Sequence, residues 1–166
     1  MILETERLCL RRLQLDDALR MSEYRSKTEV KQYQSWNHYT IKDASKRISQ
    51  CLKVDCLYKP RVNYHLGMTL KSGFLIGDLF VDIVNDHAYV LGYTLDSAYW
   101  HKGYALEMVS AFIDYMYENY RMDKVLCYVY EDNVRSVRLL KKLGFEEFER
   151  SYFYNDVGYV KVMKDD

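Results

Sequence analysis

Residues Tyr99–Met108, YWHKGYALEM, form the first stretch whose residue types and spacing could do chemistry. An alternating apolar run at 87–95 precedes them, and the apolar residues that follow recur on a 3.6-residue period. The stretch is therefore predicted to be a turn from a strand into a helix. The first N–H groups of a helix lack partners within it, and the helix dipole adds partial positive charge, so such a turn suits a phosphate.

Two small residues strengthen this interpretation. Gly103 would let the main chain approach an anion closely, and Ala105 would leave room for a bulky one. Both residues also fit an ordinary junction between a loop and a helix, so this pair alone decides nothing. A P-loop is excluded, because no Gly-Lys-Ser/Thr follows Gly103 and the preceding strands are expected to be antiparallel.

A second stretch, residues 132–145, contains a hydroxyl that is expected to point inward. Ser136 shares a helix face with Leu139, Leu140 and Leu143, at i, i+3, i+4 and i+7. Asp132 or Asn133 can cap this helix. An inward hydroxyl needs a partner, which is either a main-chain carbonyl one turn back or a bound ligand.

Together the two stretches resemble the GNAT acetyltransferases, in particular the branch that includes the ribosomal-protein N-acetyltransferases. Members of that branch carry Gly-Tyr-x-Leu at a strand end, Tyr-Trp-x-Lys-Gly-Tyr-Ala-x-Glu at the turn, and a helix with Asn-x-x-Ser, Lys and Gly-Phe. These motifs occur here at 92–95, 99–107 and 133–145, and the opening residues 3–11 are also typical. The resemblance spans the chain and is sparse between 27 and 63.

The resemblance implies a GNAT fold in a single domain, 1–166: a mixed α/β arrangement with a largely antiparallel sheet of about seven strands and helices on both faces. It implies transfer of the acetyl group of acetyl-CoA to a primary amine, in the first place the α-amine of a protein or peptide N-terminus. The residues then expected to bind the acyl donor are Thr94, Leu95, Trp100, His101, Lys102, Gly103, Tyr104, Ala105, Asn133 and Lys142.

The resemblance also draws attention to what is missing. Many GNAT enzymes protonate the departing thiolate with a tyrosine four residues after the position of Ser136, but Leu140 stands there, so Ser136 becomes the candidate general acid. The expected glutamate base has no counterpart, and only Asp78 and Asp82 are nearby acids. Deprotonation at pH 7 costs about 4.6 kcal/mol for a lysine amine but only about 1.4 kcal/mol for an α-amine, which therefore needs no dedicated base.

For several other side chains the sequence allows two different roles. Tyr33 and Trp36 lie in an aperiodic segment that forms part of the acceptor wall in the family, so they either bind the acceptor substrate or cap the core. Arg135, Arg138 and Lys142 share a helix face that is either solvated or meets the donor's phosphates. Glu107 is expected to complement the helix dipole rather than to catalyse. The alternatives to the leading function are a non-catalytic acyl-CoA sensor or interaction module, and an acetyltransferase of small amines such as polyamines or antibiotics.

Composition narrows the class of protein. Lys plus Arg equals Asp plus Glu at 24 each, so no global positive field favours nucleic acid. No apolar run approaches membrane-spanning length and no signal peptide is visible, so we expect a cytoplasmic protein without a membrane partner. The sequence leaves open whether the chain forms a homodimer.

The cysteines are not spaced as metal ligands. We expect free thiols and no metal, with Cys127 as a small buried hydrophobe, because ligand spacing is absent among Cys9, Cys51, Cys56 and Cys127.

The elements that must position these residues follow from periodicity and turn signals. A meander of antiparallel strands should precede the turn, and alternating helices and strands should follow it. The expected strands are 3–13, 62–70, 74–84, 87–95, 124–130, 145–154 and 157–163, and the expected helices are 16–25, 41–53, one from the turn to 120, and one from 133.

Overall fold

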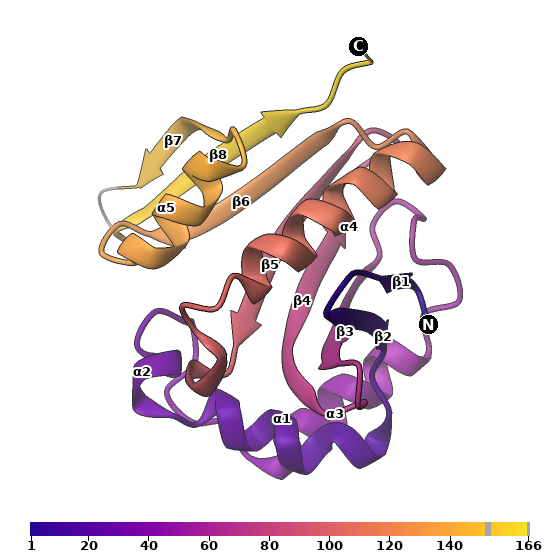
Figure 1. The fold of residues 1–166 in the computed structure, drawn as a ribbon, viewed down its shortest axis with the longest axis vertical. Helices are drawn as coiled ribbons and strands as arrows, with labels where there is room; N and C mark the ends of the chain where they lie inside the picture. The colour runs from indigo at the N-terminus through magenta and orange to yellow at the C-terminus, as the bar shows by residue number, and fades with distance from the viewer. Residues whose placement is uncertain (152–153, 166) are drawn as a thin grey trace.

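The computed structural model describes residues 1–151 and 154–165, and one mixed sheet forms its centre (Figure 1). The strand order is β1-β2-β3-β4-β5-β6-β8-β7, and every neighbouring pair is antiparallel except β5 and β6. The strands are β1 Leu3–Glu4, β2 Leu8–Arg12, β3 Asn63–Leu70, β4 Leu75–Ile83, β5 Ala88–Leu95, β6 Lys124–Tyr130, β7 Glu146–Ser151 and β8 Asp156–Val162.

The mixed, largely antiparallel sheet is confirmed, with eight strands in place of the expected seven or so. The difference lies at the N-terminus, where the single strand expected over 3–13 folds back on itself and pairs β1 with β2, Leu3 opposite Leu10. Residues 152–153, which the sequence assigned to a strand, lie outside the described residues. The helices are α1 Ala18–Arg25, α2 Thr28–Lys31, α3 Ile41–Leu52, α4 Tyr104–Tyr120 and α5 Val134–Lys142.

The helix predictions differ from the structure mainly near the N-terminus. The helix expected from Asp16 begins as a short 3₁₀ turn before α1, and α2 falls in a region without a periodic pattern. A reciprocal cap begins α3, because Thr40 and Asp43 accept hydrogen bonds from each other's main-chain N–H groups. In the described parts of the chain, no helix is both long and apolar enough to cross a membrane.

Helices cover both faces of the sheet. Figure 1 shows α4 lying across one face, where Met108, Val109 and Phe112 are buried in the same core as Leu79. Side chains alternate along a strand, so Asp78 points to the opposite face. There its carboxylate accepts hydrogen bonds from Tyr24 and from Arg25 of α1. The predicted layout, with helices on both faces, is confirmed.

The sheet opens in its middle. β5 and β6 pair over only three positions, from Ala88 opposite Lys124 to Val90 opposite Leu126. Beyond them β5 stays paired with β4 alone, as far as Leu95, and β6 stays paired with β8, as far as Tyr130. Figure 1 shows the two strands diverging from this short parallel segment. The carboxyl ends of two neighbouring parallel strands are thereby held apart.

A substitution at Gly77 tests how tightly the end of β5 packs against β4. A Cβ at Gly77 would lie 2.4 Å from the carbonyl oxygen of Thr94, so Gly77→Ala must push the end of β5 away. We expect this overpacking to lower the free energy of unfolding by about 1–3 kcal/mol. Gly92→Ala on β5 is the matched control, because its Cβ would meet Phe80 at an ordinary 3.5 Å. Urea unfolding of both variants measures the difference, and equal stabilities would contradict the prediction.

Candidate active site

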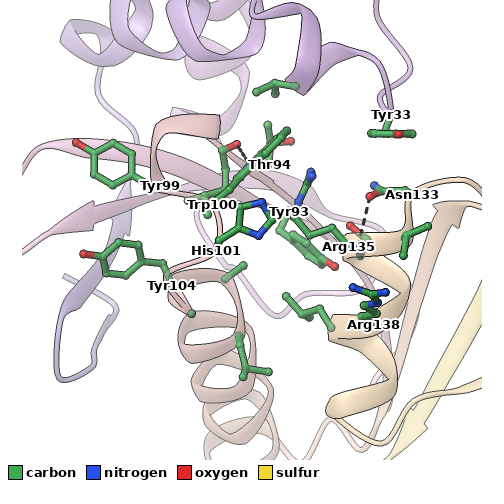
Figure 2. Close-up of a pocket in the computed structure, with 18 of the residues that line it drawn as sticks. Tyr33, Tyr93, Thr94, Tyr99, Trp100, His101, Tyr104, Asn133, Arg135 and Arg138 are labelled. Atoms are coloured by element: carbon green, nitrogen blue, oxygen red, sulfur yellow. Dashed lines mark hydrogen bonds between the residues drawn. The ribbon is translucent and has the colours of Figure 1, made fainter.

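The opening between β5 and β6 leads into a cavity of about 730 Å³. The end of β5, the turn before α4, the first turn of α4 and one face of α5 form its walls. Figure 2 shows Tyr93, Thr94 and Trp100 on one side of this cavity and Asn133, Arg135 and Arg138 on the other. Nearly all residues that the sequence predicts to bind the donor line it, namely Thr94, Leu95, Trp100, His101, Gly103, Tyr104, Ala105, Asn133 and Lys142.

The register of β5 decides which main-chain groups face this opening. Val84 donates to the carbonyl of Ala88, and Asp96 donates to the carbonyl of Ile76. Hydrogen-bonded pairs alternate along an antiparallel ladder, so Thr94 exchanges its bonds with Asp78 on β4. The main-chain groups of Tyr93 and Leu95 point the other way, into the opening. Of the two predicted residues, Leu95 has a main-chain N–H on this side, while Thr94 contributes its side chain.

The turn before α4 leaves the helix N-terminus uncapped. Gly103 has a φ of 80° and is the N-cap residue, and no side chain accepts a hydrogen bond there. The amides of the first turn of this 17-residue helix therefore remain available beside the cavity. A positive φ is easy for glycine and strained for residues with a Cβ, which explains the residue type at this position.

Contacts from distant parts of the chain hold the turn in place. The indole of Trp100 donates to the carbonyl of Leu95 at 2.9 Å. Asp96 is buried and forms ion pairs with Arg20 and, at 2.6 Å, with Lys27. The loop that carries the candidate donor site is thus tied both to the strand end and to the helices at the other side of the sheet.

Glu107 has a structural role. It accepts hydrogen bonds from Thr5 at 2.6 Å and from the Arg7 side chain at 2.7 Å, and Arg7 also donates to the carbonyl of Lys102. Burial raises the pKa of Glu107, but these hydrogen bonds outweigh burial and hold the pKa below its ordinary value. Lys102 itself is exposed and does not line the cavity, unlike its predicted neighbours.

The first turn of α5 forms the facing wall. Asn133 caps the helix by accepting a hydrogen bond from the N–H of Ser136. The prediction that Ser136 points inward is confirmed, since it is 6% exposed and lines the cavity. Within the described part of the chain, its hydroxyl makes no hydrogen bond to a main-chain carbonyl, so the local partner expected as one alternative is not used.

Cations border the same cavity. The guanidinium of Arg135 lies 3.4 Å from the centre of the Trp100 ring and so connects α5 to the turn before α4. Arg138 and Lys142, with Lys141, line the cavity further along α5. This helix face therefore meets the cavity instead of facing only solvent.

A second cavity of about 500 Å³ adjoins the first. Tyr93, Thr94, Asn133 and Ser136 line both, as does Tyr33. Its further walls are mainly aromatic, with one carboxylate at the start of β8; they include Trp36, Phe80, Tyr128, Tyr130 and Asp156.

The two residues of the predicted acceptor wall both line the second cavity. Tyr33 lies where the cavities meet. Trp36 lines only the second cavity, and it also donates to the carbonyl of Arg25 at 2.8 Å and packs on the Arg25 guanidinium at 4.3 Å. Trp36 therefore covers buried groups and also lines a cavity.

Comparison with known proteins agrees with this geometry. A family model described as an acetyltransferase (GNAT) domain matches residues 7–146, which include both walls of the first cavity. The chain belongs to the GNAT acetyltransferase family. It is accordingly an acetyl-CoA-dependent N-acetyltransferase, as its relatives are.

The relatives of this GNAT protein include the uncharacterized N-acetyltransferase p20 of Bacillus licheniformis, 29% identical over 148 residues that cover 87% of this chain and 82% of p20. Two solved structures share the fold at lower identity. Ribosomal-protein-S5-alanine acetyltransferase from Vibrio fischeri has a TM-score of 0.78 at 21% identity, covering 96% of this chain and 95% of that one. Spermidine N-acetyltransferase from Vibrio cholerae, in complex with CoA and spermine, has a TM-score of 0.80 at 16% identity, covering 95% and 96%.

The buried acid of this GNAT domain is not a free base. Burial raises the pKa of Asp78, but the charge of Arg25, with hydrogen bonds from Arg25 and Tyr24, outweighs burial and lowers the pKa. His65 lines the second cavity, where burial, with help from Arg25 and Arg47, lowers its pKa to about 3. Its Nδ1 already accepts a hydrogen bond from Arg47 at 2.8 Å. Neither group can take a proton easily at neutral pH.

Tyr93 is a site residue that the sequence motifs did not single out. Tyr93 belongs to the Gly-Tyr-x-Leu motif, lines both cavities, and ends in a buried hydroxyl without a hydrogen-bond partner among the described residues. The motif signals a strand end, but only the divergence of β5 from β6 shows that this side chain borders a cavity. All four cysteines are free, and in the part of the chain that the structure describes no group of three His, Cys, Asp or Glu could hold a metal ion.

The buried ion pair between Asp78 and Arg25 is expected to stabilise the fold. Asp78→Asn leaves the buried Arg25 charge uncompensated, and we expect a loss of about 3–5 kcal/mol in unfolding free energy. Since the folded-state pKa of Asp78 is lowered, its contribution exists above the unfolded pKa and disappears as pH falls, so the variant should also lose that part of the acid sensitivity.

Asp82→Asn is the matched control for this prediction. Asp82 lies on the same face of β4 and forms no ion pair with the described residues. Its stability should change by no more than about 0.5 kcal/mol. Urea unfolding at pH 7 and at pH 4 compares the two, and similar small losses would show that the buried pair does not stabilise the fold.

Proposed function

We propose that this chain transfers the acetyl group of acetyl-CoA to the α-amine of a protein or peptide N-terminus. The observation that carries the proposal is the opening between β5 and β6, where two adjoining cavities meet at a strand end that β6 does not pair with. One cavity suits the acyl donor and the other suits an amine, so the two substrates meet at Tyr93, Thr94 and Ser136.

The first cavity fits acetyl-CoA. The uncapped amides of α4 suit its pyrophosphate, and the cations of α5 suit the phosphates of its adenosine end. Main-chain groups of Tyr93 and Leu95 face the opening as the edge of a strand does, and they would pair with the amide groups of the pantetheine arm. The Leu95 N–H is then a donor for the oxyanion of the tetrahedral intermediate.

Ser136 is the proposed proton donor to the departing thiolate. It lines both cavities, its hydroxyl is not held by a main-chain carbonyl of the described residues, and the competing position is a fully buried Leu140. Many enzymes gain about 10²–10⁴-fold from a general acid, and the low end applies here because a thiol of pKa ~8.5 already leaves well.

The second cavity favours an amine that needs no strong base. Its aromatic walls and the carboxylate of Asp156 suit an amine or ammonium group, while Asp78 and His65 are not free to remove a proton. An α-amine is neutral often enough at pH 7 to react without such a base. The similarity to a ribosomal-protein acetyltransferase supports this acceptor. The similarity to a spermidine acetyltransferase supports a polyamine as the second candidate.

The test is thiol release from acetyl-CoA with a panel of peptide N-termini, polyamines, aminoglycosides and amino acids. We expect the highest kcat/KM with peptides, and blocking the peptide α-amine while leaving a lysine should abolish the reaction. A preference for a polyamine would overturn the proposed peptide acceptor but leave the acetyltransferase activity in place. Tight donor binding without turnover on any acceptor would favour a non-catalytic acyl-CoA sensor.

The donor site predicts the effect of Gly103→Val. A Cβ at Gly103 would meet Arg7 Nη2 at 3.3 Å, so the turn that presents the α4 amides should shift and affinity for coenzyme A should fall at least tenfold by calorimetry. Gly73→Val is the matched control, because Gly73 also has a positive φ, of 93°, but lies away from both cavities. Both variants carry similar backbone strain, of about 1–3 kcal/mol. An unchanged affinity in Gly103→Val would place the pyrophosphate elsewhere.

A further inference from the structure

Two tyrosines on one face of β5 end in buried hydroxyls that have no hydrogen-bond partner among the described residues, Tyr89 and Tyr93. Buried polar groups are nearly always bonded, so each of these hydroxyls needs an explanation. Tyr89 lies where β5 still pairs with β6, borders neither cavity, and packs its ring edge-on against Phe112. Tyr93 lies beyond the last β5–β6 pair and borders both cavities.

Tyr93 and Ser136 line the same two cavities. Burial raises the pKa of Tyr93 far above its ordinary value, and the Ser136 hydroxyl lowers it in part. The two oxygens do not form a hydrogen bond with each other in this structure. Where the donor cavity and the acceptor cavity join, the buried Tyr93 hydroxyl has no hydrogen-bond partner among the described residues, and the Ser136 hydroxyl is not held by a main-chain carbonyl of those residues.

The proposed reaction needs such a pair. When acetyl transfer is complete, the acceptor nitrogen must have lost a proton and the sulfur must have gained one. A serine hydroxyl does not ionise in the pH range in which proteins work, so Ser136 can give up its proton only if another proton replaces it in the same step. Asp78 and His65 cannot mediate the exchange, because their proton-accepting atoms are already engaged.

We propose that Tyr93 is a catalytic residue that completes a proton relay with Ser136, an inference that rests on the proposed function. As the carbon–sulfur bond breaks, its electron pair goes to sulfur, which takes the proton of Ser136 Oγ. Ser136 Oγ takes the proton of Tyr93 Oη, and Tyr93 Oη takes the proton that the acceptor nitrogen loses. One proton is thereby moved from nitrogen to sulfur, and both hydroxyls end as they began.

The surroundings of Tyr93 suit this role. A concerted relay never leaves a free tyrosinate, so the burial that disfavours the charged phenolate does not oppose it. The relay also explains how an active site with Leu140 in place of the usual tyrosine can still move the proton to the thiolate. The substrates supply the hydrogen-bond partners that the Tyr93 hydroxyl lacks.

The experiment compares Tyr93→Phe with Tyr89→Phe. Each variant removes one buried, unpartnered hydroxyl from the same face of the same strand, so their effects on folding should be alike. With a peptide acceptor, Tyr93→Phe should lower kcat by about 10–100-fold with coenzyme A affinity unchanged, whereas Tyr89→Phe should keep the wild-type kcat. The solvent deuterium isotope effect on kcat should decrease in Tyr93→Phe and stay the same in Tyr89→Phe.

A double variant tests whether the two hydroxyls act together. Members of one relay are not additive, so Ser136→Ala with Tyr93→Phe should lose little more than the worse single variant. Losses that multiply would assign the two hydroxyls separate roles and overturn the relay. A Tyr93→Phe variant that behaves like Tyr89→Phe would overturn the inference while leaving the proposed function intact. A wild-type protein that releases no thiol with any acceptor would instead overturn the proposed function, and the relay with it.

Discussion

The divergence of β5 from β6 is the constraint on which the rest of this structure depends. Parallel pairing stops after Val90, so among the described strands the strand end that follows pairs with β4 alone. A buried strand edge without partners is costly unless something pairs with it. In this GNAT fold the opening leaves main-chain groups of Tyr93 and Leu95 facing a cavity, and substrate amides are suitable partners for them.

Ion pairs hold the two sides of this opening in place. Asp96, Asp78 and Glu107 each bind arginine side chains that come from distant parts of the chain. These three acids therefore fix β4, β5 and the start of α4 relative to the N-terminal helices and strands. Because these carboxylates are engaged with cations, their pKa values are lowered and they are poor bases.

The proposed chemistry relies mainly on neutral groups. Main-chain amides, the uncapped end of α4 and two hydroxyls surround the region where the cavities join. Such groups stabilise developing negative charge without reorganising, which is a large part of what acyl transfer requires. An acceptor amine that is partly neutral at physiological pH matches a site of this kind better than a lysine side chain does.

The sequence by itself determined the order of the elements, the turn into α4 and the inward phase of Ser136, because periodicity, glycine and capping residues act over a few neighbouring positions. It also indicated the family through three local motifs. The sequence did not predict which strands and helices contact each other over long sequence separations. The fold-back of β1 onto β2, the commitment of Asp78 to Arg25, and the exposure of Tyr93 to two cavities all depend on which strands and helices meet in space. The same local pattern at Tyr89 and Tyr93 gives two buried tyrosines, and only the point at which β5 leaves β6 makes one of them part of the site.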